Sequence, residues 1–121
     1  MTAFDYPHRM DRARRELDAH GVDVLLASLG SDLPYLTGYE AMPLERLTMA
    51  VVPRRGEPVL VVPELEAPRV ERLPGVFAVQ PWAETQDPVA MVAELIGSAS
   101  TAMIGDHTWA VFLLALQNEL S

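Results

Sequence analysis

The residues best suited to bind a metal or move a proton are three histidines, His8, His20 and His107. Paired histidine ligands normally stand four residues apart on one helix, or on neighbouring strands together with carboxylates. His8 and His20 are twelve residues apart at opposite ends of one predicted helix, so they cannot share an ion. His107 follows Asp106 at the start of another predicted helix, where a role in the helix cap is enough to explain it. The histidine pattern therefore predicts no metal site in this chain.

The serines, glycines and carboxylates form no catalytic pattern either. No serine stands in a G-x-S-x-G elbow, and no glycine-rich phosphate loop is present. Asp23 begins a predicted strand, but the stretches 48–52 and 58–62, in the next two strands, contain no acidic residue. A two-metal nuclease would need several carboxylates around its ions. We therefore predict that the chain holds no catalytic residues.

One segment, Ser31–Glu40 (SDLPYLTGYE), gathers hydroxyl groups around a glycine. Recognition residues commonly lie on loops of this kind, so Tyr35 and Tyr39 could contact a ligand. Alternatively, Tyr35 and Leu36 fill the edge of the core and Gly38 only permits the turn. The residues alone leave both interpretations open.

Composition and charge exclude several classes of protein. A net charge of −8 over 121 residues argues against a nucleic-acid partner, because phosphate binding depends on basic residues. No apolar run is long enough for a membrane span, and no apolar segment follows the basic N-terminus as in a secretory signal. Cysteine is absent, which excludes disulfides and fits a cytoplasmic protein.

The arginines fall into two clusters. They are Arg9, Arg12, Arg14 and Arg15 near the start, and Arg54 and Arg55 within one turn. We interpret the first cluster as the solvated face of a helix.

The apolar periodicity predicts alternating helices and strands. Helices are predicted over 8–20, 64–73, 87–96 and from 106 onward, and strands over 22–27, 47–53, 58–62, 76–79 and 101–104. Gly56 between the second and third strands predicts a hairpin. Pro34 disfavours helix just before it, so PYLTGY is predicted to be a loop or a single turn. Asp87 and Asp106 are predicted N-caps.

This order predicts one α/β domain over residues 1–121. A hairpin followed by alternating strands and helices gives a mixed sheet with parallel crossovers and helices on both faces, and the order resembles the ribonuclease H fold. The last predicted helix should lead into a further strand. We interpret this as a sign that the sequence is a fragment of a longer protein.

Three ordered motifs carry a resemblance to a known family. They are Gly21–Leu26 (GVDVLL), Tyr35–Tyr39 (YLTGY) and 50–66 (AVVPRRGEPVLVVPELE). Shorter matches are Arg12 with Leu17, Glu45-Arg46-Leu47, Trp82-Ala83-Glu84, Asp87-Pro88 and Ile104-Gly105-Asp106. Together they span nearly the whole chain, which resembles the N-terminal domain of creatinase/prolidase (Xaa-Pro dipeptidase, aminopeptidase P) metallopeptidases.

The resemblance implies a ribonuclease H-like N-terminal domain, joined in the parent protein to a C-terminal "pita-bread" domain that holds the active site. In the peptidases of this family, two Asp, one His and two Glu bind two divalent metals, usually manganese or cobalt. Those ligands have no counterpart in residues 1–121. The chain is therefore expected to bind no cofactor and, by itself, to hydrolyse nothing.

The resemblance also implies a role for the domain. Such domains help to form dimers and lean over the active site, where they restrict substrate entry. By position, Tyr35, Tyr39, Glu40 and Arg46 are the candidates for a substrate rim, and an arginine there could bind a carboxylate through two hydrogen bonds. The expected partners are the C-terminal catalytic domain, a second copy in a homodimer and, for the parent, proline-containing peptides; nucleic acid and membrane are not expected.

Three other functions stay open at this point. The chain could be a stand-alone binding or oligomerisation module of the same fold. It could also be the N-terminal domain of a creatinase-like amidinohydrolase. A small ribonuclease H-like nuclease is disfavoured by the acidic charge and by the missing carboxylates.

Overall fold

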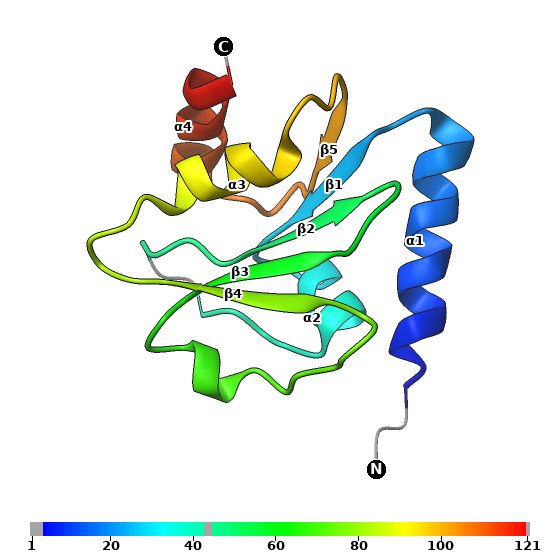
Figure 1. Ribbon diagram of the computed structural model, residues 1–121, viewed down its shortest axis with the longest axis horizontal. Coiled ribbons are helices and arrows are strands. Elements are labelled where there is room, and N and C mark those ends of the chain that lie inside the picture. Colours follow the sequence, from blue (N-terminus) through cyan, green and yellow to red (C-terminus); the bar gives the residue numbers. More distant parts are fainter. Residues whose placement is uncertain (1–3, 43–44, 121) are drawn as a thin grey trace.

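A five-stranded mixed sheet lies at the centre of the protein in the computed structural model, which describes residues 4–42 and 45–120 (Figure 1). The strands are β1 (Val24–Ala27), β2 (Met49–Pro53), β3 (Val59–Pro63), β4 (Ala78–Trp82) and β5 (Ala102–Ile104), in the order β4-β3-β2-β1-β5. Adjacent strands among β1, β2 and β3 are antiparallel, whereas β4 runs parallel to β3 and β5 parallel to β1. The predicted α/β class, the mixed sheet and the hairpin around Gly56 are confirmed.

Two apolar layers pack on opposite faces of the sheet because side chains alternate along each strand. Leu60 and Val62 of β3 join one buried cluster, and Val61 joins the other. The first cluster includes buried residues of α1 (Tyr6–His20) and α2 (Asp32–Thr37). The second includes residues of α3 (Pro88–Ile96) and α4 (Ala110–Leu120). Helices therefore cover both faces, as predicted (Figure 1).

The predicted helices over 8–20 and 87–96 are confirmed as α1 and α3. The Asp5 carboxylate accepts a hydrogen bond from the N–H of His8, which lets α1 begin at Tyr6. Gly21, with φ at 65°, ends it in the left-handed conformation that glycine tolerates. Asp87 caps α3 by accepting bonds from the N–H groups of the second and third helical residues. Among the described residues, no helix combines the length and the apolarity that a membrane crossing requires.

The segment Asp32–Thr37 forms a short helix, α2, where a loop or a single turn was predicted. Pro34 occupies the first turn, where a missing N–H removes no intrahelical bond. Leu33 and Leu36 are buried in the core, and this burial stabilises the helix beyond its local propensity. Gly38, at φ 77°, ends it.

The helix predicted over 64–73 is wrong. The structure has only one 3-10 turn there, Ala67–Arg69, followed by extended backbone at Val70. Pro68 lies in the middle of the predicted helix. It has no N–H for the carbonyl of Glu64, and its ring would collide with that carbonyl.

The fourth strand is displaced from its predicted position at 76–79. It runs from Ala78 to Trp82 and includes Pro81. Because β4 lies at the edge of the sheet and, among the described residues, pairs only with β3, a proline removes no necessary ladder bond.

The last helix begins later than predicted, at Ala110, so Asp106 is not its N-cap. A turn precedes the helix, in which the N–H of Thr108 bonds to the carbonyl of Gly105. The Asp106 carboxylate instead lies 2.9 Å from Nδ1 of its neighbour His107.

Candidate functional site

Tyr35 is the most accessible aromatic residue among the four predicted rim residues. It lies on α2, and its side chain is 44% exposed. The guanidinium of Arg9 stacks over the Tyr35 ring at 4.3 Å and over the Phe4 ring at 4.4 Å. Arg9 also donates a 3.0 Å hydrogen bond to the Tyr35 carbonyl. The start of α1 thus fixes the orientation of an exposed tyrosine.

Tyr39 occupies a different environment, because its ring belongs to the core and is only 6% exposed. Its hydroxyl donates to Oε1 of Glu66 at 3.1 Å, and Arg69 donates to the same oxygen at 3.1 Å. Burial, followed by the bond to the Glu66 carboxylate, raises the pKa of Tyr39 above its ordinary value. In this structure the Tyr39 hydroxyl therefore has its hydrogen-bond partner inside the domain.

Arg46 and Glu40 are both exposed. Nη1 of Arg46 lies 2.6 Å from Oε1 of Glu84, in an ion pair whose side chains remain largely accessible. None of the hydrogen bonds or ion pairs in the described ranges joins two of the four predicted rim residues. The structure therefore places three of them at the surface and one in the core, without linking them into a single constellation.

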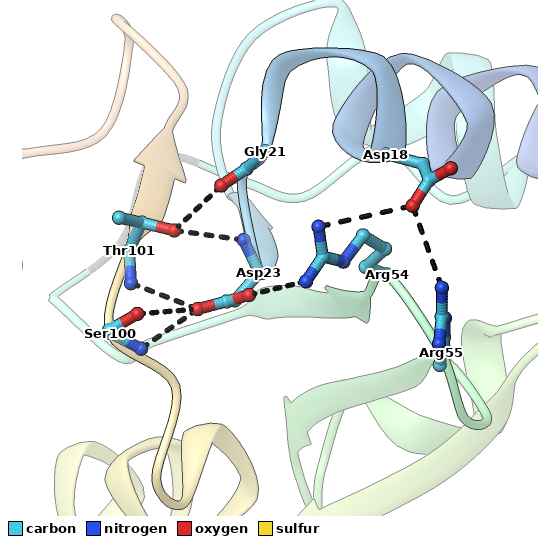
Figure 2. Close-up of polar contacts among 7 residues, drawn as sticks. All are labelled: Asp18, Gly21, Asp23, Arg54, Arg55, Ser100 and Thr101. Carbon is cyan, nitrogen blue, oxygen red and sulfur yellow. Dashed lines mark hydrogen bonds and ion pairs between the residues drawn. The ribbon is translucent and has the colours of Figure 1, made fainter.

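Among the described residues, the carboxylate of Asp23, just before β1, accepts more hydrogen bonds than any other side chain (Figure 2). Its Oδ2 accepts hydrogen bonds from the N–H and hydroxyl of Ser100, both at 2.9 Å, and from the N–H of Thr101 at 3.3 Å. Its Oδ1 accepts from Nη2 of Arg54 at 3.0 Å. One side chain therefore ties the start of β1 to the end of β2 and to the loop before β5.

Backbone atoms complete this junction. The N–H of Asp23 donates to the Thr101 hydroxyl at 3.0 Å, and that hydroxyl lies 3.4 Å from the Gly21 carbonyl (Figure 2). The hydrogen bond from the Ser100 N–H, with further donation from the Ser100 hydroxyl, Thr101 and Arg54, lowers the pKa of Asp23 although burial opposes the shift. Every donor is paired with the carboxylate inside the domain, so the arrangement is suited to structural support rather than to proton transfer.

The lowered pKa predicts how stability depends on pH. A carboxylate whose folded pKa is depressed stabilises the fold above its unfolded pKa of about 3.9, and this contribution is lost as the pH falls through the folded value. We expect Asp23→Asn to lower the melting temperature at pH 7, and the difference from the wild-type chain to shrink below about pH 4. Thermal unfolding of both chains between pH 7 and pH 3 measures this. A difference that stays constant over that range would contradict the role assigned to the carboxylate.

The sequence offered little signal for this junction. In the sequence Asp23 is only a carboxylate at the start of a predicted strand, and Ser100 stands 77 residues away from it. The residues that meet at Asp23 lie in three connections: the one between α1 and β1, the one between β2 and β3, and the one between α3 and β5. The first and the last of these come together only because β1 pairs in parallel with β5.

No metal site is formed by the part of the chain that the structure describes. Within residues 4–42 and 45–120, no three histidine or acidic side chains lie close enough together to hold an ion. Asp106 and His107 contact each other at the surface, but no third such ligand joins them.

Comparisons of the sequence and of the structure with known proteins point to the same family. Residues 9–121 match the family model described as the creatinase/prolidase N-terminal domain. The chain is 31% identical over 119 residues to a probable dipeptidase PepE of Mycobacterium bovis, covering 95% of this chain and 32% of that protein. It therefore spans about a third of the length of the curated relatives it matches.

Solved structures agree with the sequence comparison. Dipeptidase PepE from Mycobacterium ulcerans superposes with a TM-score of 0.85 at 32% identity, over 98% of this chain and 34% of that chain. The creatinase/prolidase N-terminal domain of an X-Pro dipeptidase from Streptococcus pyogenes gives 0.79 at 27% identity, over 92% of both chains. The chain belongs to the creatinase/prolidase N-terminal domain family.

Proposed function

We propose that this chain is the non-catalytic N-terminal domain of an Xaa-Pro dipeptidase-like metallopeptidase, in which it helps to form a dimer and restricts the substrates that reach the active site of a C-terminal catalytic domain. The observation that carries the proposal is the share of each related protein that this chain covers. Almost all of this chain aligns with only 32% of the length of PepE, while the solved N-terminal domain of an X-Pro dipeptidase matches over 92% of both chains.

Further properties of the complete protein follow from this proposal. Its C-terminal domain binds two divalent metals, manganese or cobalt, and its substrates are proline-containing peptides. The cysteine-free composition supports a cytoplasmic location. The fold is ribonuclease H-like, which is supported by the antiparallel run β1-β2-β3 with β5 parallel beside β1.

Within the complete protein, Tyr35, Glu40 and Arg46 form the substrate rim. Each has an exposed side chain, and Arg46 is oriented by a single accessible carboxylate, that of Glu84, which a substrate carboxylate can replace. Tyr39 contributes by holding the segment between Tyr35 and Glu40 in place, through its bond to Glu66.

Peptide selectivity of the complete protein tests this role. We expect Arg46→Ala to change the ratio of kcat/KM for an Xaa-Pro dipeptide to that for a longer Xaa-Pro peptide, because the rim acts on substrate size and on the free carboxylate. Arg72→Ala is the matched control, an exposed arginine outside the rim. An unchanged ratio in Arg46→Ala, or an equal change in the control, would sink the proposed gating role.

The isolated chain is proposed to self-associate through the open edge at β5. Within the described ranges, β5 pairs with β1 only. The carbonyl of Thr101 and the N–H of Gly105 bond to the β1 side, so by alternation the backbone groups of Ala102 and Ile104 point away from the sheet. An exposed edge of this kind pairs readily with another strand.

A proline substitution in β5 tests whether self-association depends on strand pairing at this edge. We expect the wild-type chain to show a mass that rises with concentration, and Ala102→Pro to remain monomeric, because proline removes the outward N–H without disturbing the bonds to β1. Size-exclusion chromatography with light scattering gives the masses, and Ala102→Ser serves as the control that keeps the N–H. A wild-type chain that is monomeric at high concentration would rule out self-association through this edge.

A further inference from the structure

A groove of about 380 Å³ lies between α1 and the tip of the β2–β3 hairpin. Its lining consists of charged residues from these two elements, Asp11, Arg14, Arg15, Asp18, Arg54 and Arg55. Two arginines from each of the two clusters in the sequence thus meet at one place in the fold, although Arg54 lies 39 positions after Arg15.

The groove is built by the helix period and by the hairpin turn. Asp11, Arg14, Arg15 and Asp18 share one face of α1 because residues three and four apart are neighbours on a helix. Met10 and Leu17 anchor another face of α1 in the core. Nη2 of Arg14 donates a 2.7 Å hydrogen bond to the carbonyl of Gly56 at the hairpin tip, which fixes the helix against the turn.

The carboxylates in and beside the groove compensate the arginines only in part. Asp18 lies 3.9 Å from Nη1 of Arg54 and 3.8 Å from Nη2 of Arg55, which are ion-pair separations longer than hydrogen bonds (Figure 2). Asp23 binds Arg54 from beyond the groove, but it also accepts three bonds from Ser100 and Thr101.

The lining therefore carries an excess of positive charge, because four guanidinium groups face only two lining carboxylates. Among the described residues, Arg15 has no carboxylate partner, and the side chain of Arg55 is 85% exposed. Arginine stays protonated at every physiological pH. This excess contrasts with the net charge of −8 of the whole chain.

We propose that this groove is a binding site for a small anion that carries two or more oxyanion groups. Guanidinium groups bind phosphate and carboxylate oxygens through paired hydrogen bonds, and the volume of the groove lies in the range of small-molecule sites. Half-buried Arg14 and Arg54 are held in place by the Gly56 carbonyl and by Asp23, while exposed Arg15 and Arg55 are available to the ligand. The site is independent of the proposed peptidase function.

Calorimetric titration of the chain at low ionic strength tests the proposal, with inorganic tripolyphosphate and citrate as the two probes. We expect saturable one-to-one binding that weakens with added salt. Binding of both probes identifies a general polyanion site, and binding of tripolyphosphate alone identifies a phosphate site. Absence of saturable binding for both probes overturns the proposal.

Three variants then locate the site. Arg55→Gln, which removes an exposed charge, is expected to weaken binding roughly tenfold by loss of charge-assisted hydrogen bonds. Arg72→Gln, an exposed arginine outside the groove, is expected to leave it unchanged. Asp18→Asn is expected to tighten binding severalfold, because it removes the carboxylate that competes for Arg54 and Arg55. A misfolded variant would not bind more tightly. Equal losses in Arg55→Gln and Arg72→Gln, or weaker binding by Asp18→Asn, would refute the location.

Discussion

Replacing Leu60 by alanine is expected to lower the free energy of unfolding by about 3 kcal/mol, in the range measured for buried leucines that leave a cavity. Leu60 is fully buried in β3, a strand flanked on both sides by β2 and β4. It stands opposite Ala50 on one neighbour and Val79 on the other, so paired strands hold the backbone on both sides of the space that the substitution leaves. Urea unfolding followed by circular dichroism measures the loss.

Leu65→Ala provides the matched control, since the same atoms are removed from a side chain that is 74% exposed. Its expected effect is within about 0.5 kcal/mol of zero, as for surface substitutions generally. Equal losses for the two variants would mean that the Leu60 side chain does not lie in the core.

Trp82→Ala is expected to destabilise the domain by about 3–5 kcal/mol, the usual range for a buried tryptophan. The Trp82 ring is buried in the second cluster, and its Nε1 donates a 2.8 Å hydrogen bond to the carbonyl of Leu47. The bond fixes β4 against the segment before β2. Trp82 also stands two residues before Glu84, the partner of Arg46, so it supports the proposed rim.

Trp82→Phe separates the contribution of the buried ring from that of the hydrogen bond to the Leu47 carbonyl. Phenylalanine keeps most of the buried apolar area but leaves the Leu47 carbonyl without its donor, which costs roughly 1–3 kcal/mol. The expected order of stability is wild type, then Trp82→Phe, then Trp82→Ala, measured by urea unfolding with circular dichroism. A Phe variant as stable as the wild type would show that the hydrogen bond contributes nothing.

The regular elements were predictable where local signals agreed with the tertiary structure. The cap at Asp87 and the apolar runs on both sides of Gly56 act within a few residues, so the sequence pattern indicates them directly. The prediction over 64–73 failed because a single residue inside the segment, Pro68, prevents the helix.

The helix α2 was missed for the opposite reason. The local effect of Pro34 predicts a break in the helix, whereas burial of Leu33 and Leu36 against the sheet stabilises the turn as a helix. Tertiary burial of this kind leaves no periodic pattern in a segment of six residues.

The sites depend on long-range contacts that a single sequence does not display. Asp23 and Ser100 meet only because β5 pairs with β1, and Arg15 joins Arg54 in one groove only because the hairpin tip reaches α1. Residue types indicated the arginine clusters, but their convergence could be found only in the structure. The ordered family motifs, in contrast, were sufficient to identify the family, since residues 9–121 match its model.

Hydrolysis of an Xaa-Pro dipeptide, assayed with manganese and with cobalt, tests the central proposal most directly when it is measured for the complete gene product and for residues 1–121 alone. We predict metal-dependent hydrolysis by the complete protein, abolished by a chelator and restored by the metal, and no hydrolysis above buffer by residues 1–121. Turnover by residues 1–121 alone, or a complete protein that is inactive on every Xaa-Pro peptide with either metal, would contradict the assignment of this chain as the non-catalytic domain of such a peptidase.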